Sequence, residues 1–421
     1  MRSLYKKITS SITIKNGIWL YILQFFNTVF PLLTLPYVTR ILGTNNYGIF
    51  SYALNIITYL QVIVEYGFNL SGARKIAICD NEKEIEKIYS KIVTTKILLL
   101  FLSLIILIPV IILSNFTIMQ IYTIGIMFCI VLGTSITQTW VFQGKQKMKF
   151  VTISNVIIRF IFMILIFTLV KNENDLYLYS FLYAIAFVVI GIVQTIIISK
   201  MLRYKLKWCK FKECIDELKD GWYTFTTSAI SKIYVGIGVT LLGIINGANA
   251  SVVGIYSAIQ KIPMVINMAY APIGQAIFPY ISKKYKTDKT FAIKFINKLV
   301  KLTFLCLLVV IILTVFFSRN IINIVFGEEY TEYHTILIPL VIWAFLGILN
   351  NILGIQVLVA QGKNKEYSRA FFIGSISIIG FNLILGIPFG VYGVSISVML
   401  AELLLSILLI REVYWGKEIK E

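Results

Sequence analysis

The sequence predicts an all-α integral membrane protein of about twelve transmembrane helices, and three features carry this prediction. The chain is 58% hydrophobic and only 14% charged, whereas a soluble domain has roughly 25% charged residues. Its mean hydropathy is +0.83. Apolar runs of about 20 residues, each long enough to cross a bilayer as a helix, recur from Gly17 to Arg411. This composition argues against a water-soluble fold.

The apolar runs favour helices over a β-barrel, because their hydrophobic residues are continuous and do not alternate. No long hydrophilic stretch separates them, which leaves no room for a soluble catalytic domain. The predicted spans are residues 17–39, 47–68, 92–114, 117–142, 151–170, 177–199, 222–245, 250–281, 295–317, 334–360, 368–388 and 391–410.

The distribution of basic residues predicts the topology. With the N-terminus inside, 33 of the 39 Lys and Arg residues fall in inner segments, among them the segment 74–96, and only Arg40, Lys171 and Arg319 fall in outer loops. Cytoplasmic loops of membrane proteins collect such residues. We therefore expect a multi-pass protein with both termini in the cytoplasm. The same distribution accounts for the net charge of +19 without nucleic acid as a partner.

Two short segments occur twice. The sequence GIFS at 48–51 returns as GIYS at 254–257, and VFQGKQK at 141–147 returns as VAQGKNK at 359–365. Each repeat pairs one predicted helix with the sixth helix after it, which predicts two parallel six-helix pseudo-repeats around a central cavity. The predicted domains are an N-terminal six-helix bundle at 1–200, a cytoplasmic amphipathic linker at 201–221 and a C-terminal six-helix bundle at 222–421.

The linker has a helical stripe of apolar residues. Its members are Tyr204, Trp208, Phe211, Ile215 and Leu218. Their spacing of three or four residues predicts an amphipathic helix on the inner membrane surface, with its lysines toward anionic headgroups. Membrane lipids are therefore an expected partner. The alternative is a solvated linker.

Apart from the basic residues counted with the inner segments, five charged residues lie within predicted spans: Glu65, Arg159, Lys232, Lys261 and Glu402. Each costs roughly 2.5–3.5 kcal/mol on insertion scales, so each needs a partner or a water-filled cavity. With three cations and two anions, at least one cation lacks an internal partner. One alternative is that Glu402 forms a buried ion pair with a cation such as Arg159 and serves only packing.

Polar side chains form stripes on the first, second, seventh and eighth predicted spans, two matched pairs from the two halves. This pattern predicts a wet cleft between the halves, and its lysines suit an anion, because charge-assisted hydrogen bonds form when a ligand brings oxygen atoms. The predicted lining is Gln24, Asn27, Asn55, Lys232, Ser257, Gln260, Lys261 and Gln275.

Several chemistries lack their motifs. The sequence has no G-x-x-x-x-G-K-[ST] segment, and its single histidine, His334, excludes an H-E-x-x-H site. No closely spaced aspartate pair suggests a metal site. We therefore expect no cofactor, no metal and no enzymatic activity. None of the five cysteines lies in a predicted outer loop, which argues against disulfides.

The segments RILG at 40–43, YGIFSYA at 47–53, GF at 67–68 and RKIA at 74–77 resemble the N-terminal signature of bacterial polysaccharide (O-antigen and capsule repeat-unit) flippases. These belong to the multidrug/oligosaccharidyl-lipid/polysaccharide exporter superfamily. Segments 253–257 and 275–280 and both Gln-Gly-Lys sites resemble later parts of the family, so the likeness covers most of the chain. It implies translocation of undecaprenyl-pyrophosphate-linked oligosaccharide from the inner to the outer leaflet of the bacterial cytoplasmic membrane.

The resemblance also implies roles for residues. Basic cavity residues would meet the pyrophosphate, a role open to Lys232 and Lys261, then to Arg159, with Arg40 nearer the outer rim. Glu65 and Glu402 are the first candidates for coupling to protons or sodium. The polysaccharide polymerase machinery is a further implied partner.

Three other functions compete with this one. A drug or metabolite exporter of the same superfamily would present carboxylates to cationic drugs, but here lysines outnumber them. A peptidoglycan-precursor flippase would use the same charge chemistry. A membrane glycosyltransferase or polymerase is disfavoured by the short predicted outer loops and the lack of carboxylate pairs.

Overall fold

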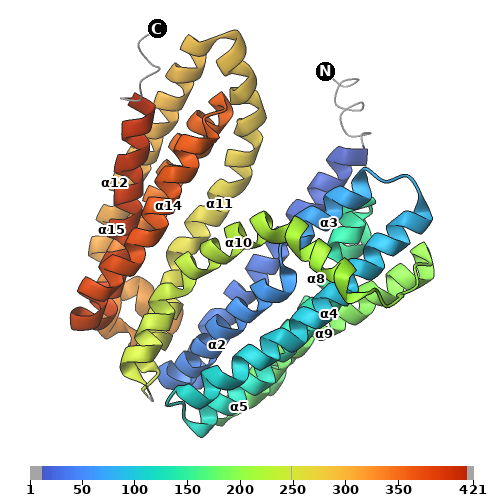
Figure 1. Ribbon diagram of the computed structural model, residues 1–421. Coiled ribbons are helices and arrows are strands. Elements are labelled where there is room, and N and C mark those ends of the chain that lie inside the picture. Colours follow the sequence, from blue (N-terminus) through green and yellow to red (C-terminus); the bar gives the residue numbers. More distant parts are fainter. Residues whose placement is uncertain (1–11, 248, 415–421) are drawn as a thin grey trace. The chain divides into compact units, whose positions relative to one another are not determined.

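The computed structural model describes residues 12–247 and 249–414, and in these ranges every regular element is a helix (Figure 1). Ten helical stretches there are long and apolar enough to cross a membrane. The predicted all-α integral membrane class is confirmed. Basic residues near the chain ends that entered the predicted topology, such as Arg2 and Lys420, lie outside the described residues.

Two of the ten stretches are much longer than one membrane crossing needs. Lys15–Ala77 has 63 residues and Asn364–Tyr414 has 51. Each contains a glycine with positive φ, Gly43 in the first and Gly390 in the second. The count of about twelve spans stays a prediction.

The chain reverses direction at Gly43, inside helix α2 (Ile12–Glu65). Before it, Tyr37 donates a hydrogen bond to the carbonyl of Val170 at 2.6 Å; after it, Asn46 donates to the carbonyl of Glu173 at 2.9 Å. Both arms of α2 thus meet the same short connection, so they run antiparallel. Gly43 has φ 70° and ψ 175°, a conformation that glycine adopts at no steric cost.

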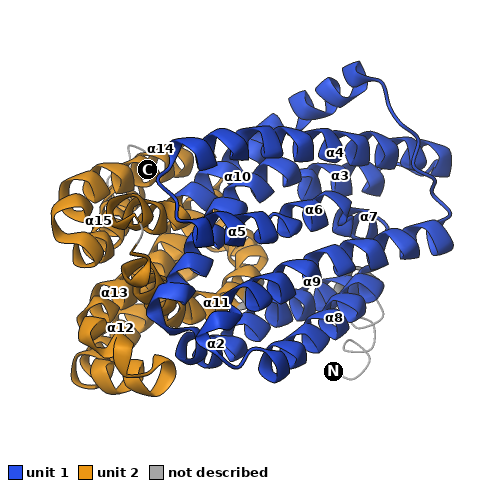
Figure 2. Ribbon diagram, turned by 90° about the horizontal axis from the view of Figure 1, so that it is seen from below, with its two compact units in different colours: residues 1–233 blue, residues 234–421 orange. Residues whose placement is uncertain are grey.

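The described chain forms two compact units, residues 1–233 and 234–421 (Figure 2). The boundary lies inside helix α10. The predicted division into domains at 1–200 and 222–421 stays a prediction. After α2, unit 1 contains α3 (Phe68–Ala77), α4 (Glu82–Leu113), α5 (Ile118–Met127), α6 (Cys129–Ile136), α7 (Thr139–Gly144), α8 (Met148–Leu169), η1 (Glu173–Asp175), α9 (Leu176–Ile197), η2 (Ile198–Leu202) and the start of α10 (Phe211–Asn246).

Unit 2 contains the rest of α10 and nine further elements. They are α11 (Ser251–Thr287), α12 (Lys289–Phe326), η3 (Glu328–Ile336), α13 (Leu337–Asn351), η4 (Ile352–Leu358), η5 (Val359–Gln361), α14 (Asn364–Phe381), η6 (Asn382–Gly386) and α15 (Ile387–Tyr414). The α14 and α15 helices form an antiparallel pair, because Arg369 near the start of α14 bonds Glu412 near the end of α15 at 2.6 Å.

Glycines allow α6 and α9 to pack closely in unit 1. A Cβ on Gly133 would lie 2.5 Å from the backbone carbon of Phe187, and a Cβ on Gly191 would lie 2.4 Å from the Ile136 side chain. Any larger residue would push the two helices apart. This close packing fixes the position of Phe187, which matters for the site described below.

The helix that contains Lys96 begins before the predicted span 92–114. Lys96 ends the predicted inner basic segment 74–96, and helix α4 begins at Glu82, where the Asn81 side chain accepts a hydrogen bond from the Lys83 amide at 3.0 Å. The N-terminal cap therefore starts the helix well before the apolar run, and Lys96 lies inside it with only 2% of its surface exposed.

The predicted amphipathic helix is also shorter than its apolar stripe suggests. Residues 203–210 are not helical, and α10 begins at Phe211. The backbone here bonds polar side chains of α4 instead: the Lys205 amide donates to Glu86 at 3.0 Å, and the Lys207 amide donates to Ser90 at 3.2 Å. Tyr204 is buried and donates a hydrogen bond to Glu82. Burial is the main cause that raises the pKa of its phenol, and the bond to the Glu82 carboxylate raises this pKa further.

Candidate functional site

Unit 1 contains a polar cavity of about 290 Å³, here called the unit 1 cavity. Helices α2, α3, α4, α6, α7, α8 and α9 contribute to it, and amide, hydroxyl and charged groups dominate its wall. The lining residues are Leu23, Asn27, Gln61, Glu65, Asn69, Lys96, Thr134, Thr137, Thr139, Asn155, Arg159, Phe187 and Ile190. The reversal at Gly43 brings residues from both arms of α2 to this one space.

Lys96 enters the cavity from the packed face of α4. Ile92 and Leu99, one turn before and after it, are both buried, and residues at this spacing share one helix face. The Lys96 ammonium donates a hydrogen bond to the carbonyl oxygen of Thr137 at 2.7 Å. A buried ammonium thus has one strong acceptor in the wall.

The Thr137 carbonyl is available because the helix is broken there. Helix α6 ends at Ile136, Thr137 is extended with ψ 125°, and α7 begins at Thr139. The Gln194 side chain accepts a hydrogen bond from the Gln138 amide at 2.9 Å. A broken helix is tolerated at membrane depth where protein groups or water satisfy the freed backbone, and Lys96 and Gln194 do so here.

Arg159 is the second cation of the cavity. It lies one turn after Asn155 on α8, so both face the same side. Its guanidinium carbon lies 5.0 Å from the ring centre of Phe187, a cation–π contact. The buried Nε of Arg159 has no hydrogen-bond partner among the residues that the structure describes, and neither has the buried Oδ1 of Asn27. Arg159 therefore has a donor available for a ligand.

The second arm of α2 supplies Gln61 and Glu65, one turn apart. Gln61 donates a hydrogen bond to the Thr134 hydroxyl at 3.1 Å. Glu65 is the single carboxylate among the lining residues, against the two cations Lys96 and Arg159. With all three ionised, the wall carries a net positive charge, which favours an anionic ligand.

Glu402 in unit 2 is buried, with 7% of its surface exposed. Tyr234 donates a hydrogen bond to its carboxylate, and the Asn350 amide donates to its Oε1 at 3.1 Å. Ser406 in turn donates to the Asn350 oxygen at 2.7 Å. Neutral groups therefore hold this carboxylate, and its role in coupling stays a prediction.

The remaining predicted site residues lie outside the unit 1 cavity. On α2, Gln24 and Arg40 are exposed and Asn55 is half-buried. On α10, Lys232 is exposed. On α11, Ser257 and Gln260 are buried, Lys261 is half-buried and Gln275 is exposed. Lys232 belongs to unit 1 and Lys261 to unit 2. The predicted cleft between the halves stays a prediction.

The structure brings together three of the predicted residues, Asn27, Glu65 and Arg159. Sequence reasoning missed Lys96, although a signal existed. The buried residues of α4 include Tyr89, Ile92, Leu99 and Ser103, and Lys96 continues their spacing of three and four residues. A lysine on an apolar helical stripe is a candidate for a buried functional position.

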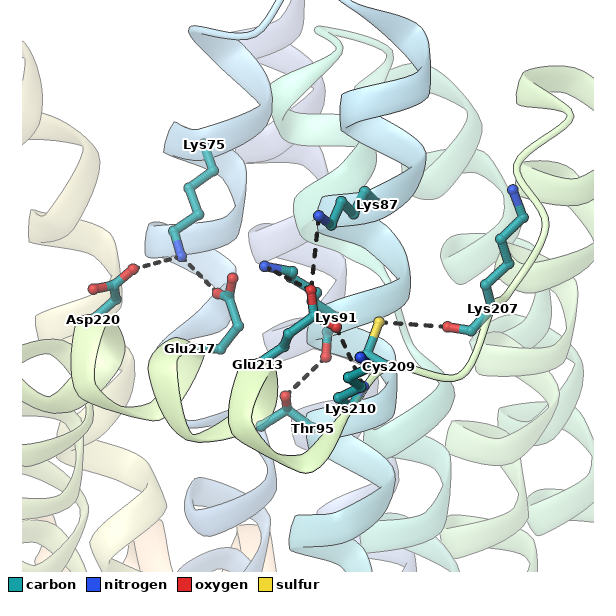
Figure 3. A network of polar contacts seen from close by, with 10 residues as sticks. All are labelled: Lys75, Lys87, Lys91, Thr95, Lys207, Cys209, Lys210, Glu213, Glu217 and Asp220. Carbon is teal, nitrogen blue, oxygen red and sulfur yellow. Dashed lines mark hydrogen bonds and ion pairs between the residues drawn. The ribbon is translucent and has the colours of Figure 1, made fainter.

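An ion-pair network holds the start of α10 against α3 and α4 (Figure 3). Lys75 on α3 pairs with Glu217 at 2.6 Å and with Asp220 at 3.0 Å. Glu213 lies 3.5 Å from Lys91 and 3.7 Å from Lys87 on α4. All of these residues belong to unit 1. The network fixes the point where the linker enters α10.

Comparison with known proteins identifies the family. The family described as polysaccharide biosynthesis protein matches residues 13–285 of the chain. The chain belongs to this family. This polysaccharide biosynthesis protein is 29% identical to a Shigella dysenteriae protein named as an O-antigen transporter. The match extends over 401 residues, which cover 95% of this chain and 99% of that one. An Escherichia coli (strain K12) protein named in the same way is 29% identical over 400 residues, 94% of this chain and 95% of that one.

Two solved structures share the fold of this polysaccharide biosynthesis protein. The lipid II flippase MurJ, in an inward closed conformation, aligns with a TM-score of 0.69 and 17% identity over 95% of this chain and 87% of that one. An inward-facing multidrug resistance MATE transporter of the MOP superfamily aligns with a TM-score of 0.63 and 15% identity over 92% and 94%. The chain therefore has the MOP superfamily fold and is a multi-pass bacterial membrane protein.

Proposed function

We propose that this protein is a flippase that moves undecaprenyl-pyrophosphate-linked oligosaccharide repeat units from the inner to the outer leaflet of the bacterial cytoplasmic membrane. The translocated repeat units would enter O-antigen or capsule synthesis. The observation that carries the proposal is the unit 1 cavity, where Lys96 and Arg159 face one carboxylate inside a helical bundle. The family and the names of the relatives support the substrate class.

The cavity suits the two parts of such a headgroup. Arg159 presents a planar fork of donors that matches phosphate oxygens, and a second cation strengthens the attraction. Amide and hydroxyl groups of Asn27, Gln61 and Asn155 can bond sugar hydroxyls. At about 290 Å³ the cavity lies at the small end of ligand pockets, so it would hold the phosphates and the nearest sugar.

The proposed activity is transport and not catalysis, because no covalent bond changes. An inside-negative potential favours export of an anionic headgroup by roughly 2.3 kcal/mol per charge per 100 mV. We propose Lys232 and Lys261 as further cations on the substrate path, and Glu65 and Glu402 as the first residues to test for ion coupling. Both termini would lie in the cytoplasm, and the polysaccharide polymerase machinery would be a further partner.

A drug exporter of the same superfamily is the main rival. The fold is shared with MATE transporters, but a cationic drug would meet two cations and one carboxylate in the unit 1 cavity, and like charges repel. A peptidoglycan-precursor flippase would use the same phosphate chemistry. Only the chemical identity of the accumulated lipid separates that rival from the repeat-unit flippase.

Deletion of the gene, followed by analysis of lipid-linked intermediates, tests the proposal. Completed repeat units should accumulate on the undecaprenyl carrier, and the wild-type gene should clear them. Arg159→Gln should leave them accumulated at normal protein level, while Arg319→Gln, an exposed arginine on α12, should clear them like wild type. Accumulation of peptidoglycan precursors instead, or no lipid-linked intermediate at all, would overturn the proposal.

A further inference from the structure

Arg159 lines a second hollow besides the unit 1 cavity. This apolar pocket of about 40 Å³ lies between α2, α8 and α9, also within unit 1. Hydrocarbon groups dominate its wall. The lining residues are Phe30, Pro31, Thr34, Arg159, Phe162, Met163, Ile166, Leu182, Tyr183 and Ala186. Among the described residues, no other one lines both spaces.

On α2 and α8 the wall changes from polar to apolar at the level of Arg159, whereas the lining residues of α9 are mainly apolar on both sides of it. On α2, Asn27 lines the unit 1 cavity and Phe30 the apolar pocket, one turn later. On α8, Asn155 precedes Arg159 and Met163 follows it. On α9, Ile190 lines the unit 1 cavity and Ala186 the apolar pocket. The guanidinium thus lies at a junction between a polar and an apolar space.

A sugar linked to a prenyl phosphate has this sequence of chemistry: sugar, phosphate and then branched hydrocarbon. We propose that the junction is a prenyl-phosphate subsite, in which Arg159 binds the phosphate, the unit 1 cavity takes the first sugar and the apolar pocket takes the first carbons of the isoprenoid chain. The inference rests on the proposed function and names the point in the protein where the polar headgroup of that substrate gives way to its hydrocarbon chain. By binding the phosphate, Arg159 would fix how far the substrate enters the unit 1 cavity.

The dimensions fit a short part of the chain. A space of about 40 Å³ accommodates roughly three groups of the size of water, which matches a few carbons of one isoprene unit. The rest of the chain would stay in the bilayer. Each methylene group moved from water into an apolar pocket strengthens binding about fourfold, so two or three carbons should strengthen it at least about tenfold.

The test compares two soluble probes on the purified full-length protein, inorganic pyrophosphate and farnesyl pyrophosphate, by calorimetry with a detergent blank. Wild type should bind farnesyl pyrophosphate at least about tenfold more tightly. Ala186→Leu, which fills the apolar pocket, should reduce this preference to less than about threefold and leave inorganic pyrophosphate binding unchanged. Ala269→Leu, at an exposed alanine on α11, should keep the full preference. Arg159→Gln should weaken both probes at least about tenfold.

A second pocket variant guards against a folding defect. If Ala186→Leu fails to bind inorganic pyrophosphate, Met163→Gln, which keeps the volume and adds polarity, takes its place with the same expectation. Equal affinity of wild type for both probes would overturn the subsite, as would a preference that survives in the pocket variant. Loss of inorganic pyrophosphate binding by both pocket variants would also overturn it, because the pocket would then be structural.

The outcome for the subsite is separate from that for the proposed function. If Arg159→Gln blocks clearance of lipid-linked repeat units in cells but the pocket variant keeps its preference, the flippase stands and the subsite falls. If deletion of the gene leaves lipid-linked intermediates unchanged but the pocket variant loses the preference, the subsite stands for another prenyl phosphate and the proposed function falls.

Discussion

Lys96 on α4 donates a hydrogen bond to the carbonyl oxygen of Thr137, 2.7 Å away at the break between α6 and α7. Arg159, the other cation of the unit 1 cavity, has a buried Nε without such a partner among the described residues. The two cations therefore have different tasks. Lys96 stabilises the wall of the cavity and adds charge, whereas Arg159 has a donor left for a ligand.

Replacement of Lys96 should therefore lower stability as well as activity. Lys96→Met leaves the Thr137 carbonyl without its donor, and an unsatisfied buried polar group costs roughly 1–3 kcal/mol. We expect a lower thermal midpoint, measured by fluorescence-detected size-exclusion chromatography of heated samples. Lys83→Met, on the exposed start of the same helix, is the matched control. Equal midpoints for Lys96→Met and the control would show that this bond does not support the fold.

The ion pair between Lys75 and Glu217 should contribute measurably to the stability of unit 1. Glu217 is mostly buried, with 9% of its side chain exposed, while Lys75 has 26% exposed. A double-mutant cycle of Lys75→Met and Glu217→Gln should give a coupling energy of about 1 kcal/mol, at the upper end for partly exposed pairs. A coupling energy near zero would mean that Asp220 alone replaces the lost partner.

Gly43→Ala should destabilise the protein because the reversal in α2 needs φ 70° with ψ 175°. A backbone held in this region costs an ordinary residue roughly 1–3 kcal/mol. Gly17→Ala is the control in the same helix: a Cβ there meets nothing within 4 Å, and alanine favours a helix by roughly 0.5–1 kcal/mol over glycine. The two variants should shift the thermal midpoint in opposite directions, and a shift of the same sign would contradict the reversal.

Cysteine labelling tests both the topology and the packing of the linker. Cys79 and Cys209 should react with a membrane-impermeant maleimide in inside-out vesicles and not in intact spheroplasts, as measured on single-cysteine variants. Burial raises the pKa of the Cys209 thiol, so its thiolate fraction at a given pH is lower than that of a free cysteine. Its labelling rate should keep increasing at a pH where free cysteine has already reached its plateau. A normal pH profile would show that residues 203–210 do not pack on α4.

The sequence allowed good prediction of the elements because the apolar runs are long and continuous. Each predicted span is helical over most of its length, although the span 117–142 contains the break at residues 137–138. Asn27, Glu65 and Arg159 could also be found, since a charged or amide side chain within an apolar run is costly and so conspicuous. Lys96 escaped because it lies only four residues into the predicted span 92–114 and also belongs to the inner basic segment 74–96, whereas helix α4 begins ten residues before that span.

The grouping of the site could not be predicted, because it depends on which helices pack together. Gln61, Thr134 and Asn155 come from three helices, and nothing in their local sequence shows that they share one space. Their meeting depends on the reversal at Gly43 and on the close packing of α6 and α9 at Gly133. Likewise, the apolar stripe of the linker could not show that residues 203–210 bond the side chains of α4.

The most direct test of the central claim is a flipping assay in proteoliposomes with undecaprenyl-pyrophosphate-linked oligosaccharide. The measured quantity is the rate at which the lipid on one leaflet becomes accessible to a glycosidase added on the other side. Wild type and Arg319→Gln should move the lipid at the same rate, and Arg159→Gln should move it at least about tenfold more slowly, since it lacks the charge that we propose binds the phosphate. Equal rates for Arg159→Gln and wild type would contradict the account.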